Sequence, residues 1–596
     1  MFRILKLLFI FLCCINTRML SKMKDKLKNV FKTTSNSAFG IPYTICEDFI
    51  LLAYGDVENK RKTDFIGTSL DKRTMMVYSY CRNSNTYKKI LQSEVFDDEI
   101  EHIIPADFDM SGKISFLLIF RTGILYRNKI LFQEKAINNL PNTERIPILF
   151  ADLELQPCLL VQINKEIKLL HKITKENFKI EKFLEIEDLS LSHSSSFVDV
   201  DGDLKADLIF VTNENDNNKI VIFTNSNMNY ERSPNEILIG KTGPIVFGNF
   251  VGDGSNDIAY ISEENKNWYL NILINKKLKF CSNKNKEKCI DWQENIGTKA
   301  TDWGFEKDSE YHIRIPLKRF YKDLIPITFL KEIGNIPGGI TVTDLNMDGR
   351  PDLILTFFDK KLNSNVFRIL ENTGEFGENL FRPVTYETFL YKMKGILSVS
   401  SADPENIGTE GLVINREYDG TYILEYSRNY LGSGNLKLSA ITILPETSKK
   451  AYGSAIPGVT YFFELYETSD IRIMTQMSQS SFLHLQHPAV FFGLGTLNLL
   501  VDEIFISLPM TSSYKNIYSI DNKIIPNSDL VLKPENTKIA VELFLNLTKY
   551  AIYTSIVVII VLIINILLVY IFYRSELKYF DKIKKSEKYA FYFEAL

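Results

Sequence analysis

The stretch Asp199-Val-Asp-Gly-Asp-Leu-Lys-Ala-Asp207, followed by Leu-Ile-Phe, decides the fold because its pattern returns along the chain. A second full copy begins at Asp344 and ends at Asp352. Acidic or amide side chains at positions 1, 3, 5 and 9 of such a loop place oxygen atoms around one point, which is how proteins hold a hard cation such as Ca²⁺. A glycine beside position 5 permits the sharp turn that the loop requires.

Weaker copies of the loop recur at a spacing of about fifty residues. The candidate loops begin at Asp56, Asp107, Asp152, Asp199, Asn249, Asp344 and Asp403. Short apolar runs such as residues 116–120 and 208–211 follow the loops, and such runs are typical of strands. Repeated units of this length with several short strands predict a β-propeller, and seven loops predict seven blades. The long step after the loop at Asn249 is interpreted as an insertion at about residues 265–335.

Two loops carry complete sets of oxygen ligands, and we predict that both bind Ca²⁺ as a structural ion. The predicted metal ligands are Asp199, Asp201, Asp203 and Asp207 in one loop and Asp344, Asn346, Asp348 and Asp352 in the other. The loop at Asn249 is an incomplete third candidate, because Val251 stands at position 3. For every loop the alternative is an acidic turn that its own side-chain hydrogen bonds stabilise.

The remaining loops depart from the pattern in ways that weaken a metal site. Lys60 stands at position 5 of the first loop, where its ammonium could replace a cation, and serines occupy positions 5 and 9 of the second. Leu160 and Gly411 occupy position 9 of the loops at Asp152 and Asp403. An EF-hand is excluded, because it requires a glutamate at position 12, which is apolar in both complete loops.

Both ends of the chain carry apolar segments. Residues 1–17 begin with basic side chains and continue into an apolar run, which predicts a secretory signal peptide. Residues 551–573 contain no charged side chain and, at ~1.5 Å per residue, would form a helix of about 34 Å, enough to cross a bilayer core of ~30 Å. The tail, residues 574–596, begins with basic side chains and is predicted to be cytoplasmic. We therefore expect a single-pass type I membrane protein.

Between the propeller, predicted over residues 45–435, and the membrane lies a second β-rich segment. Residues 440–532 alternate apolar and polar side chains and predict a small β-sandwich-like membrane-proximal domain. The expected fold class is therefore all-β: a seven-bladed propeller, this domain, and one C-terminal transmembrane helix.

The cysteines fit an oxidising compartment. Cys281 and Cys289 flank a Lys- and Asn-rich loop, and we predict that they form a disulfide. Cys46 and Cys81 are a second possible pair, and Cys158 in an apolar run is interpreted as a buried thiol.

Composition and motifs narrow the functional classes. The net charge of −3 argues against binding to nucleic acid. Lys, Asn and Ile are abundant, so we give isolated Asn residues no weight. His-Glu-x-x-His, P-loop, Gly-x-Ser-x-Gly and Cys-x-x-Cys motifs are absent from the sequence, and we expect that the protein is not an enzyme.

The acidic loops resemble the FG-GAP repeats of integrin α-subunit propellers, and Tyr54-Gly55 and Phe247-Gly248 stand where that family places its aromatic–glycine pair. Over most of its length the chain more closely resembles one family, the T-cell immunomodulatory proteins, also called integrin-α FG-GAP repeat-containing protein 1. The segments Met477-Ser-Gln-Ser-Ser-Phe482, Phe492-Gly-Leu-Gly495 and Val501-Asp-Glu-Ile-Phe-Ile-Ser-Leu-Pro509 look like that family's strand-rich part before the membrane.

This resemblance implies a type I membrane glycoprotein, or its shed ectodomain, at the plasma membrane or in the secretory pathway. The family is described as modulating T cells. We expect a Ca²⁺-stabilised propeller that binds a protein ligand on the extracellular or lumenal side for recognition, adhesion or immunomodulation. A lumenal factor that assists trafficking or folding of surface proteins is the alternative. A propeller lyase or glycosidase is a third reading and would need carboxylates or histidines converging in the central channel.

Overall fold

The computed structural model describes residues 38–593 apart from internal gaps. The gaps are residues 83, 121–122, 129–146, 174–177, 191–193, 215–216, 227–228, 277–302, 331–335, 338, 386–388, 433–434, 445–451, 466–469, 478–486, 497–500, 510, 513, 522 and 546–548. The described elements are mostly strands, which confirms the all-β fold class. The predicted signal peptide, most of the predicted insertion and the predicted Cys281–Cys289 disulfide lie outside the described residues.

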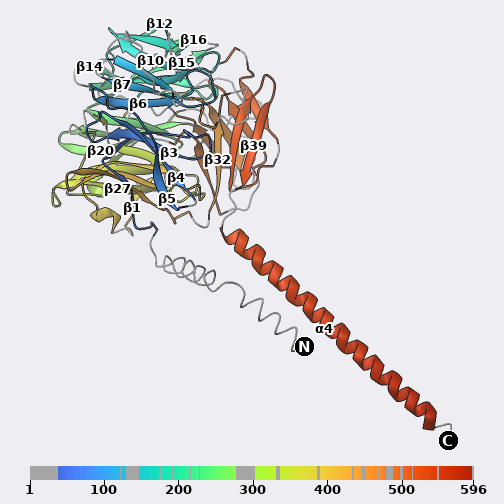
Figure 1. Ribbon diagram of the computed structural model, residues 1–596. Helices are drawn as coiled ribbons and strands as arrows, with labels where there is room; N and C mark the ends of the chain where they lie inside the picture. Colours follow the sequence, from blue (N-terminus) through green and yellow to red (C-terminus); the bar gives the residue numbers. More distant parts are fainter. Residues whose placement is uncertain are drawn as a thin grey trace. The chain divides into compact units, whose positions relative to one another are not determined.

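In the first part of the chain, the described strands form seven sheets of three or more strands, in which neighbours pair antiparallel (Figure 1). Sheet 1 holds β2 (Phe49–Gly55), β3 (Asp64–Ser69), β4 (Met75–Cys81) and β5 (Thr86–Gln92). Sheet 2 holds β6 (Ile100–Ala106), β7 (Ser115–Phe120) and β8 (Gly123–Asn128). Sheet 3 holds β9 (Ile148–Ala151), β10 (Pro157–Ile163), β11 (Glu166–His171) and β12 (Lys179–Glu185).

The next four sheets repeat this plan. Sheet 4 holds β13 (Ser196–Val198), β14 (Asp207–Glu214), β15 (Asn217–Ser226), β16 (Asn229–Arg232) and β17 (Ile237–Gly240). Sheet 5 holds β18 (Thr242–Gly248), β19 (Asp257–Glu264), β20 (Asn267–Leu273) and β21 (His312–Pro316). Sheet 6 holds β22 (Leu324–Pro326), β25 (Ile340–Thr343), β26 (Asp352–Asp359), β27 (Ser364–Asn372) and β28 (Phe381–Pro383). Sheet 7 holds β29 (Ile396–Ala402), β30 (Gly411–Tyr418), β31 (Thr421–Ser427) and, from the start of the chain, β1 (Tyr43–Glu47).

Apolar packing joins each sheet to the next and the last sheet to the first. Ile209 of sheet 4 shares a buried cluster with Tyr260 of sheet 5, and Val413 of sheet 7 shares one with Phe65 of sheet 1. Strand β1 adds a second closure, because it pairs antiparallel with β31 although it comes from the opposite end of this region. A closed ring of sheets is the plan of a β-propeller, and we call the seven sheets the ring.

Strands β32 to β39 form a two-layer sandwich. One layer has the order β35 (Val490–Gly495), β32 (Leu436–Thr442), β38 (Ser528–Pro534) and β39 (Ile539–Leu545). The other has the order β34 (Asp470–Thr475), β33 (Thr460–Leu465), β36 (Ile504–Ser507) and β37 (Ile517–Ile520). Alternate side chains of both layers, such as Leu438 and Tyr461, meet in one buried core. The strands extend past both ends of the predicted range 440–532.

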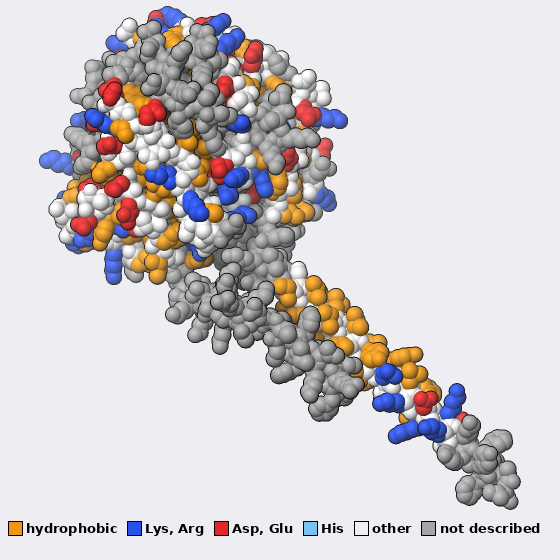
Figure 2. Space-filling model, in the orientation of Figure 1, with side chains coloured by type: hydrophobic (Ala, Val, Ile, Leu, Met, Phe, Trp, Pro, Cys, Tyr) orange, Lys and Arg blue, Asp and Glu red, His pale blue; other side chains and the backbone are white. Residues whose placement is uncertain are grey.

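Helix α4 (Lys549–Phe593) carries the predicted membrane span. Within the described part of the chain, it is the one helix long and apolar enough to cross a bilayer, and its candidate span is Ser555–Glu587. Its apolar side chains are exposed, and Lys and Arg side chains follow them toward the C-terminus (Figure 2). These properties support a single-pass membrane protein, with the tail continuing the same helix.

The described cysteines, Cys46, Cys81 and Cys158, form no disulfide with one another. Cys46 and Cys158 are buried and Cys81 is partly exposed. The second possible disulfide, between Cys46 and Cys81, is therefore not formed, whereas the buried thiol expected at Cys158 is present. Small elements complete the ring: the hairpin β23 (Phe329–Leu330) and β24 (Ile336–Pro337) and the 3₁₀ turns η1 (Leu317–Arg319) and η2 (Leu390–Lys392).

Candidate functional site

The acidic loops share one hydrogen-bonding scheme. The carboxylate at position 1 accepts hydrogen bonds from backbone N–H groups within its own loop: Asp107 from Ser111 and Gly112, and Asp344 from Asp348 and Gly349. These bonds close the tight turn that brings each chain segment back into its next strand. The loops are therefore stabilised by hydrogen bonds to their own side chains, which is what the alternative of a metal-free acidic turn predicts.

The side chain at position 9 holds the other end of each loop. Asp207 accepts the N–H of Val200 at 2.9 Å, and Asp352 accepts the N–H of Leu345 at 3.1 Å. In the second loop the serine Ser115 takes this place with a longer contact of 3.4 Å from the N–H of Phe108. Position 9 therefore has a structural role in every loop where it is polar, whether or not a cation is bound.

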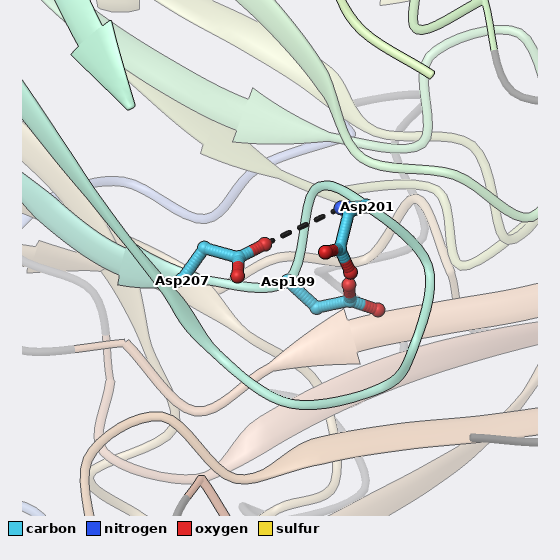
Figure 3. Close-up of side chains that lie close together, drawn as sticks. All are labelled: Asp199, Asp201 and Asp207. Atoms are coloured by element: carbon cyan, nitrogen blue, oxygen red, sulfur yellow. Dashed lines mark hydrogen bonds between the residues drawn. The ribbon is translucent and has the colours of Figure 1, made fainter. Parts of the chain in front are cut away.

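The loop at Asp199 differs from the others because its carboxylates converge. One oxygen each of Asp199, Asp201 and Asp207 lies within 4.8 Å of the others, and all three residues are buried (Figure 3). Among the described residues, this is the one group of at least three His, Cys, Asp or Glu side chains that come so close. Buried carboxylates at this spacing match the donor set that Ca²⁺ prefers, so these residues fit a cation.

The pKa values of the carboxyl groups in this loop also favour a bound cation. Burial, together with the charges of Asp201 and Asp199, raises the pKa of Asp207 well above its usual value. Burial and the charge of Asp201 raise the pKa of Asp203 to about 6, although Lys205 opposes the shift. The loop therefore stabilises a proton or a cation among its carboxylates.

Asp203, the fourth predicted ligand, lies outside this close group of carboxylates. Its carboxylate pairs with the ammonium of Lys205 at 3.2 Å and accepts the backbone N–H of Lys205 at 2.8 Å. The structure thus brings three of the four predicted ligands of this loop together and assigns the fourth to a salt bridge. The spacing of the acidic residues could not indicate this salt bridge, because a pattern of acidic positions takes no account of the lysine two positions further along the chain.

The predicted ligands of the Asp344 loop are engaged within and around the loop. Asn346 accepts the N–H of Asp348 with its carbonyl oxygen and donates its amide to the carboxylates of Asp348 and Glu371. Asp352 accepts N–H groups from Leu345 and Asn372. Ca²⁺ binding by these four residues stays a prediction.

Two weaker loops also have their ligand positions engaged. The ammonium of Lys60 at position 5 contacts the carboxylate of Glu58 at position 3 of the same loop at 2.8 Å and is exposed. In the incomplete third candidate, Asn249 accepts the N–H of Asp253, and Asp253 accepts the N–H of Ser255.

Side-chain amides link neighbouring loops in a way that the sequence analysis missed. Asn275 donates its amide to the carbonyl of Val200, which is position 2 of the preceding sheet's loop, at 2.7 Å. Asn372 makes the same bond to Phe250 at 2.9 Å, and Asn429 makes it to Leu345 at 2.7 Å. These asparagines could have been found by their spacing, because Asn275 and Asn372 follow the position-9 aspartates by 18 and 20 residues. Discounting isolated Asn residues was therefore wrong.

The sandwich covers the loop side of the ring, and all seven candidate loops contact it. Polar contacts join Asn59 to Gly453, Leu153 to Ser512, Asn225 to Pro509, Asn249 to Ile471, Met347 to Gly495, and Asp403 to Lys437. Leu204 of the Asp199 loop packs against Phe462 and Ile473, and Met110 of the second loop packs against the sandwich core. The acidic loops therefore lie at an interface between two parts of one chain.

We predict that the metal-free protein loses stability as the pH rises from 5 to 8. Burial raises the pKa of Asp64, Asp107 and Asp344 to about 7 each, far above the usual 3.8. A carboxyl group with a raised folded-state pKa binds its proton more tightly when folded, so its stabilising contribution is present at low pH and disappears as the pH passes the folded value. Thermal melting of the full chain in detergent with a chelator measures this effect. A melting temperature that rises over the same range would contradict it.

We predict that Asn275→Ala destabilises the ring by about 2 kcal/mol, because it removes two buried hydrogen bonds and orphans their partners. In one bond the side-chain amide of Asn275 donates to the backbone carbonyl of Val200. In the other, the backbone N–H of Gly304 donates to Oδ1 of the Asn275 side chain. Asn213→Ala, at an exposed position, is the matched control and should change the free energy of unfolding by less than about 0.5 kcal/mol. Equal effects in chemical denaturation would refute the linking role.

Comparisons with known proteins address identity. The family model described as "ITFG1, C2 domain" matches residues 451–542, which lie in the sandwich. A T-cell immunomodulatory protein homolog of Plasmodium yoelii yoelii is 24% identical over 585 residues, covering 81% of this chain and 80% of that protein. The T-cell immunomodulatory protein of Homo sapiens is 22% identical over 599 residues, covering 92% of each chain.

Among solved structures, one of a functionally unknown protein from Desulfotomaculum acetoxidans DSM 771 superposes with a TM-score of 0.35 at 11% identity, over 60% of this chain and 90% of that one. That similarity is too low to inform the fold. The sequence matches extend from the ring through the sandwich, and the family model falls on the part where the strand-rich segments were singled out. The comparisons therefore confirm the predicted resemblance of this chain to the T-cell immunomodulatory protein family.

Proposed function

We propose that this chain is a type I membrane protein whose Ca²⁺-stabilised propeller recognises a protein ligand outside the cytoplasm. One observation carries the proposal: the sandwich contacts all seven acidic loops, so the loop side of the ring is already occupied by the protein itself. Any cation there has a structural role, and recognition falls to the opposite side. The shared name of the relatives supports a role in cell–cell communication, and the sequence motifs supply no catalytic set.

The opposite side of the ring presents a series of tight turns. In each sheet the acidic loop joins two neighbouring antiparallel strands, so the turn that follows the second of these strands lies at the other end of the sheet. These turns carry exposed residues: Asp71, Arg73, Asn164, Lys165, Asn265, Lys266, Lys360, Lys361, Asp419 and Gly420. Turns held on a rigid ring suit partner binding, because propellers present such connections as one surface.

In this proposal Asp199, Asp201 and Asp207 hold Ca²⁺, whose charge offsets the repulsion among them. The protein's own part is to keep the three carboxylates buried and in place: Gly202 and Leu204 donate N–H groups to Asp199, and Val200 donates to Asp207. Ca²⁺ binding would thereby stiffen the loop against the sandwich residues that pack on Leu204.

The alternative is a lumenal factor that assists folding or trafficking of surface proteins within the secretory pathway. A propeller enzyme is not favoured, although the structure does bring Glu410 and His487 to the wall of one cavity of about 100 Å³. Glu410 accepts a hydrogen bond from Thr343 at 3.3 Å, and His487 is hydrogen-bonded to Thr63. Both side chains therefore act in packing between the ring and the sandwich, and we propose a non-catalytic role.

Labelling of intact cells with a membrane-impermeant amine reagent separates the two locations. For a surface receptor we expect modification of Lys165 and Lys266, with the tail residues Lys582 and Lys585 labelled only after permeabilisation. Labelling of all four lysines only after permeabilisation would favour the lumenal factor. Labelling of the tail lysines in intact cells would contradict the type I topology itself.

We predict that Asp201→Asn has opposite effects in Ca²⁺ and in chelator. In millimolar Ca²⁺ the substitution removes a charged ligand and should lower the melting temperature of the full chain. Sites of the extracellular type bind Ca²⁺ at about 10⁻⁴–10⁻³ M, so the parent site is occupied and stabilised at this concentration. In chelator it removes repulsion with Asp207 and should leave the melting temperature equal or higher. Asp188→Asn, at an exposed carboxylate, is the control and should do neither. The same melting shift in both buffers would reject the metal site.

A further inference from the structure

The loop that begins at Asp403 holds a lysine that belongs to the sandwich. Lys437 is the second residue of β32, and its side chain is only 3% exposed. Its Nζ lies 3.9 Å from Oδ2 of Asp403 and 3.5 Å from Oδ1 of Asp529. An ammonium buried this deeply requires counter-charges, because leaving water is costly for an unpaired ion.

The Asp403 loop keeps positions 1 and 3 of the complete loops as Asp403 and Glu405 but has Ile407 at position 5, where the complete loops have an aspartate. Asp403 accepts the N–H groups of Ile407 and Gly408, as position 1 does elsewhere. Gly411 stands at position 9, so the loop has no carboxylate there. The neighbouring Glu410 is buried, and burial raises its pKa to about 7 while the charge of Lys437 opposes the shift. Asp403 and Glu410 thus face an ammonium of the protein itself, whereas Glu405 at position 3 is paired with Arg428 at 2.8 Å.

We propose that the Lys437 ammonium is the built-in cation of the Asp403 loop: it takes the place that a metal ion would hold in a complete loop and fastens the sandwich to sheet 7. Lys437 reaches this position because its face of β32 points at the ring, where Lys437, Ser439 and Ile441 line a second cavity of about 100 Å³ together with Asp56 and Asp403 of the ring. The ring of Phe491 covers the ammonium, with its centroid 5.0 Å from Nζ, and excludes water from one side.

A second cation of the sandwich meets the neighbouring loop. Arg472 of β34 donates from Nη2 to the carbonyl of Asp348 at 3.4 Å. The close approach depends on two glycines: a Cβ on Gly349 would lie 2.4 Å from Nε of Arg472, and a Cβ on Gly493 would lie 2.1 Å from Oδ2 of Asp344. The sandwich therefore brings positive charge to two adjacent acidic loops, and at the Asp344 loop the close approach leaves no room for a side chain on either glycine.

The inference does not depend on partner recognition or on Ca²⁺ in the Asp199 loop. It assigns the two loops different responses: the Asp199 loop is expected to respond to Ca²⁺, whereas the Asp403 loop already contains its cation. A result that contradicts Ca²⁺ binding at the Asp199 loop would not affect the lysine pairing proposed for the Asp403 loop, and the reverse also holds. The two proposals can therefore be tested separately.

Hydrogen exchange of the full chain in detergent tests the assignment at the amides of Ile407, Gly408 and Asn527. Lys437→Met should speed exchange at these amides by about tenfold or more, because it leaves buried carboxylates without a counter-charge. Lys523→Met, at an exposed position of the sandwich, is the matched control and should change nothing there. The double variant Lys437→Met/Asp403→Asn should recover part of the lost protection. Parent-like exchange in Lys437→Met, or a double variant whose loss is the sum of the single losses, would overturn the proposal.

Amine footprinting provides a test that keeps the lysine in place. In the parent chain, a brief pulse of acetic anhydride should modify Lys437 at least about tenfold more slowly than Lys523, since Lys437 is buried and paired. Asp403→Asn should narrow this difference while leaving Lys523 unchanged. Equal reactivity of the two lysines in the parent would overturn the proposal, even if Lys437→Met failed to fold.

Discussion

The architecture depends on how the ring accommodates carboxylates that it buries. Each acidic loop turns by accepting backbone N–H groups, as Asp107 and Asp344 do, yet burial still raises the pKa of both side chains to about 7. Where three carboxylates meet, as around Asp207, N–H donors do not balance the charge and the pKa rises. The chain thus meets one electrostatic demand in different ways: by hydrogen bonds alone, by a site that fits Ca²⁺, and by lysine or arginine brought from the sandwich.

This demand explains why the sandwich and the ring form one unit. The sandwich presents Lys437 and Arg472 to neighbouring loops, and Gly493 lets its strand lie directly on the Asp344 carboxylate. Apolar contacts around Leu204 add the non-directional part of the interface. A cation bound at the Asp199 loop would therefore act on the same surface that holds the sandwich, which links metal binding to the stability of the whole unit.

Much of the fold followed from local pattern. The repeat at Asp199 and Asp344 predicted strands on both sides of each loop, because the strand runs are apolar and β-branched. It also singled out Asp199, Asp201 and Asp207, whose carboxylates lie close together in the structure. It could not indicate that Lys205 pairs with Asp203, since acidic spacing does not report a lysine that folds back. Contacts between Asn59 and Gly453, 394 residues apart, lie beyond any local signal. The amide bridges were within reach and were missed because asparagine is common in this chain.

The central claim is that the crowded carboxylates of the Asp199 loop bind a cation. Direct titration of the purified full chain with Ca²⁺ by calorimetry, after removal of bound metal, tests it most plainly. Our account predicts binding of at least one Ca²⁺ per chain in the range of about 10⁻⁴–10⁻³ M, with one fewer ion bound by Asp201→Asn. An absence of Ca²⁺ binding in the parent at millimolar concentration would contradict the account and leave the acidic loops as turns held by hydrogen bonds alone.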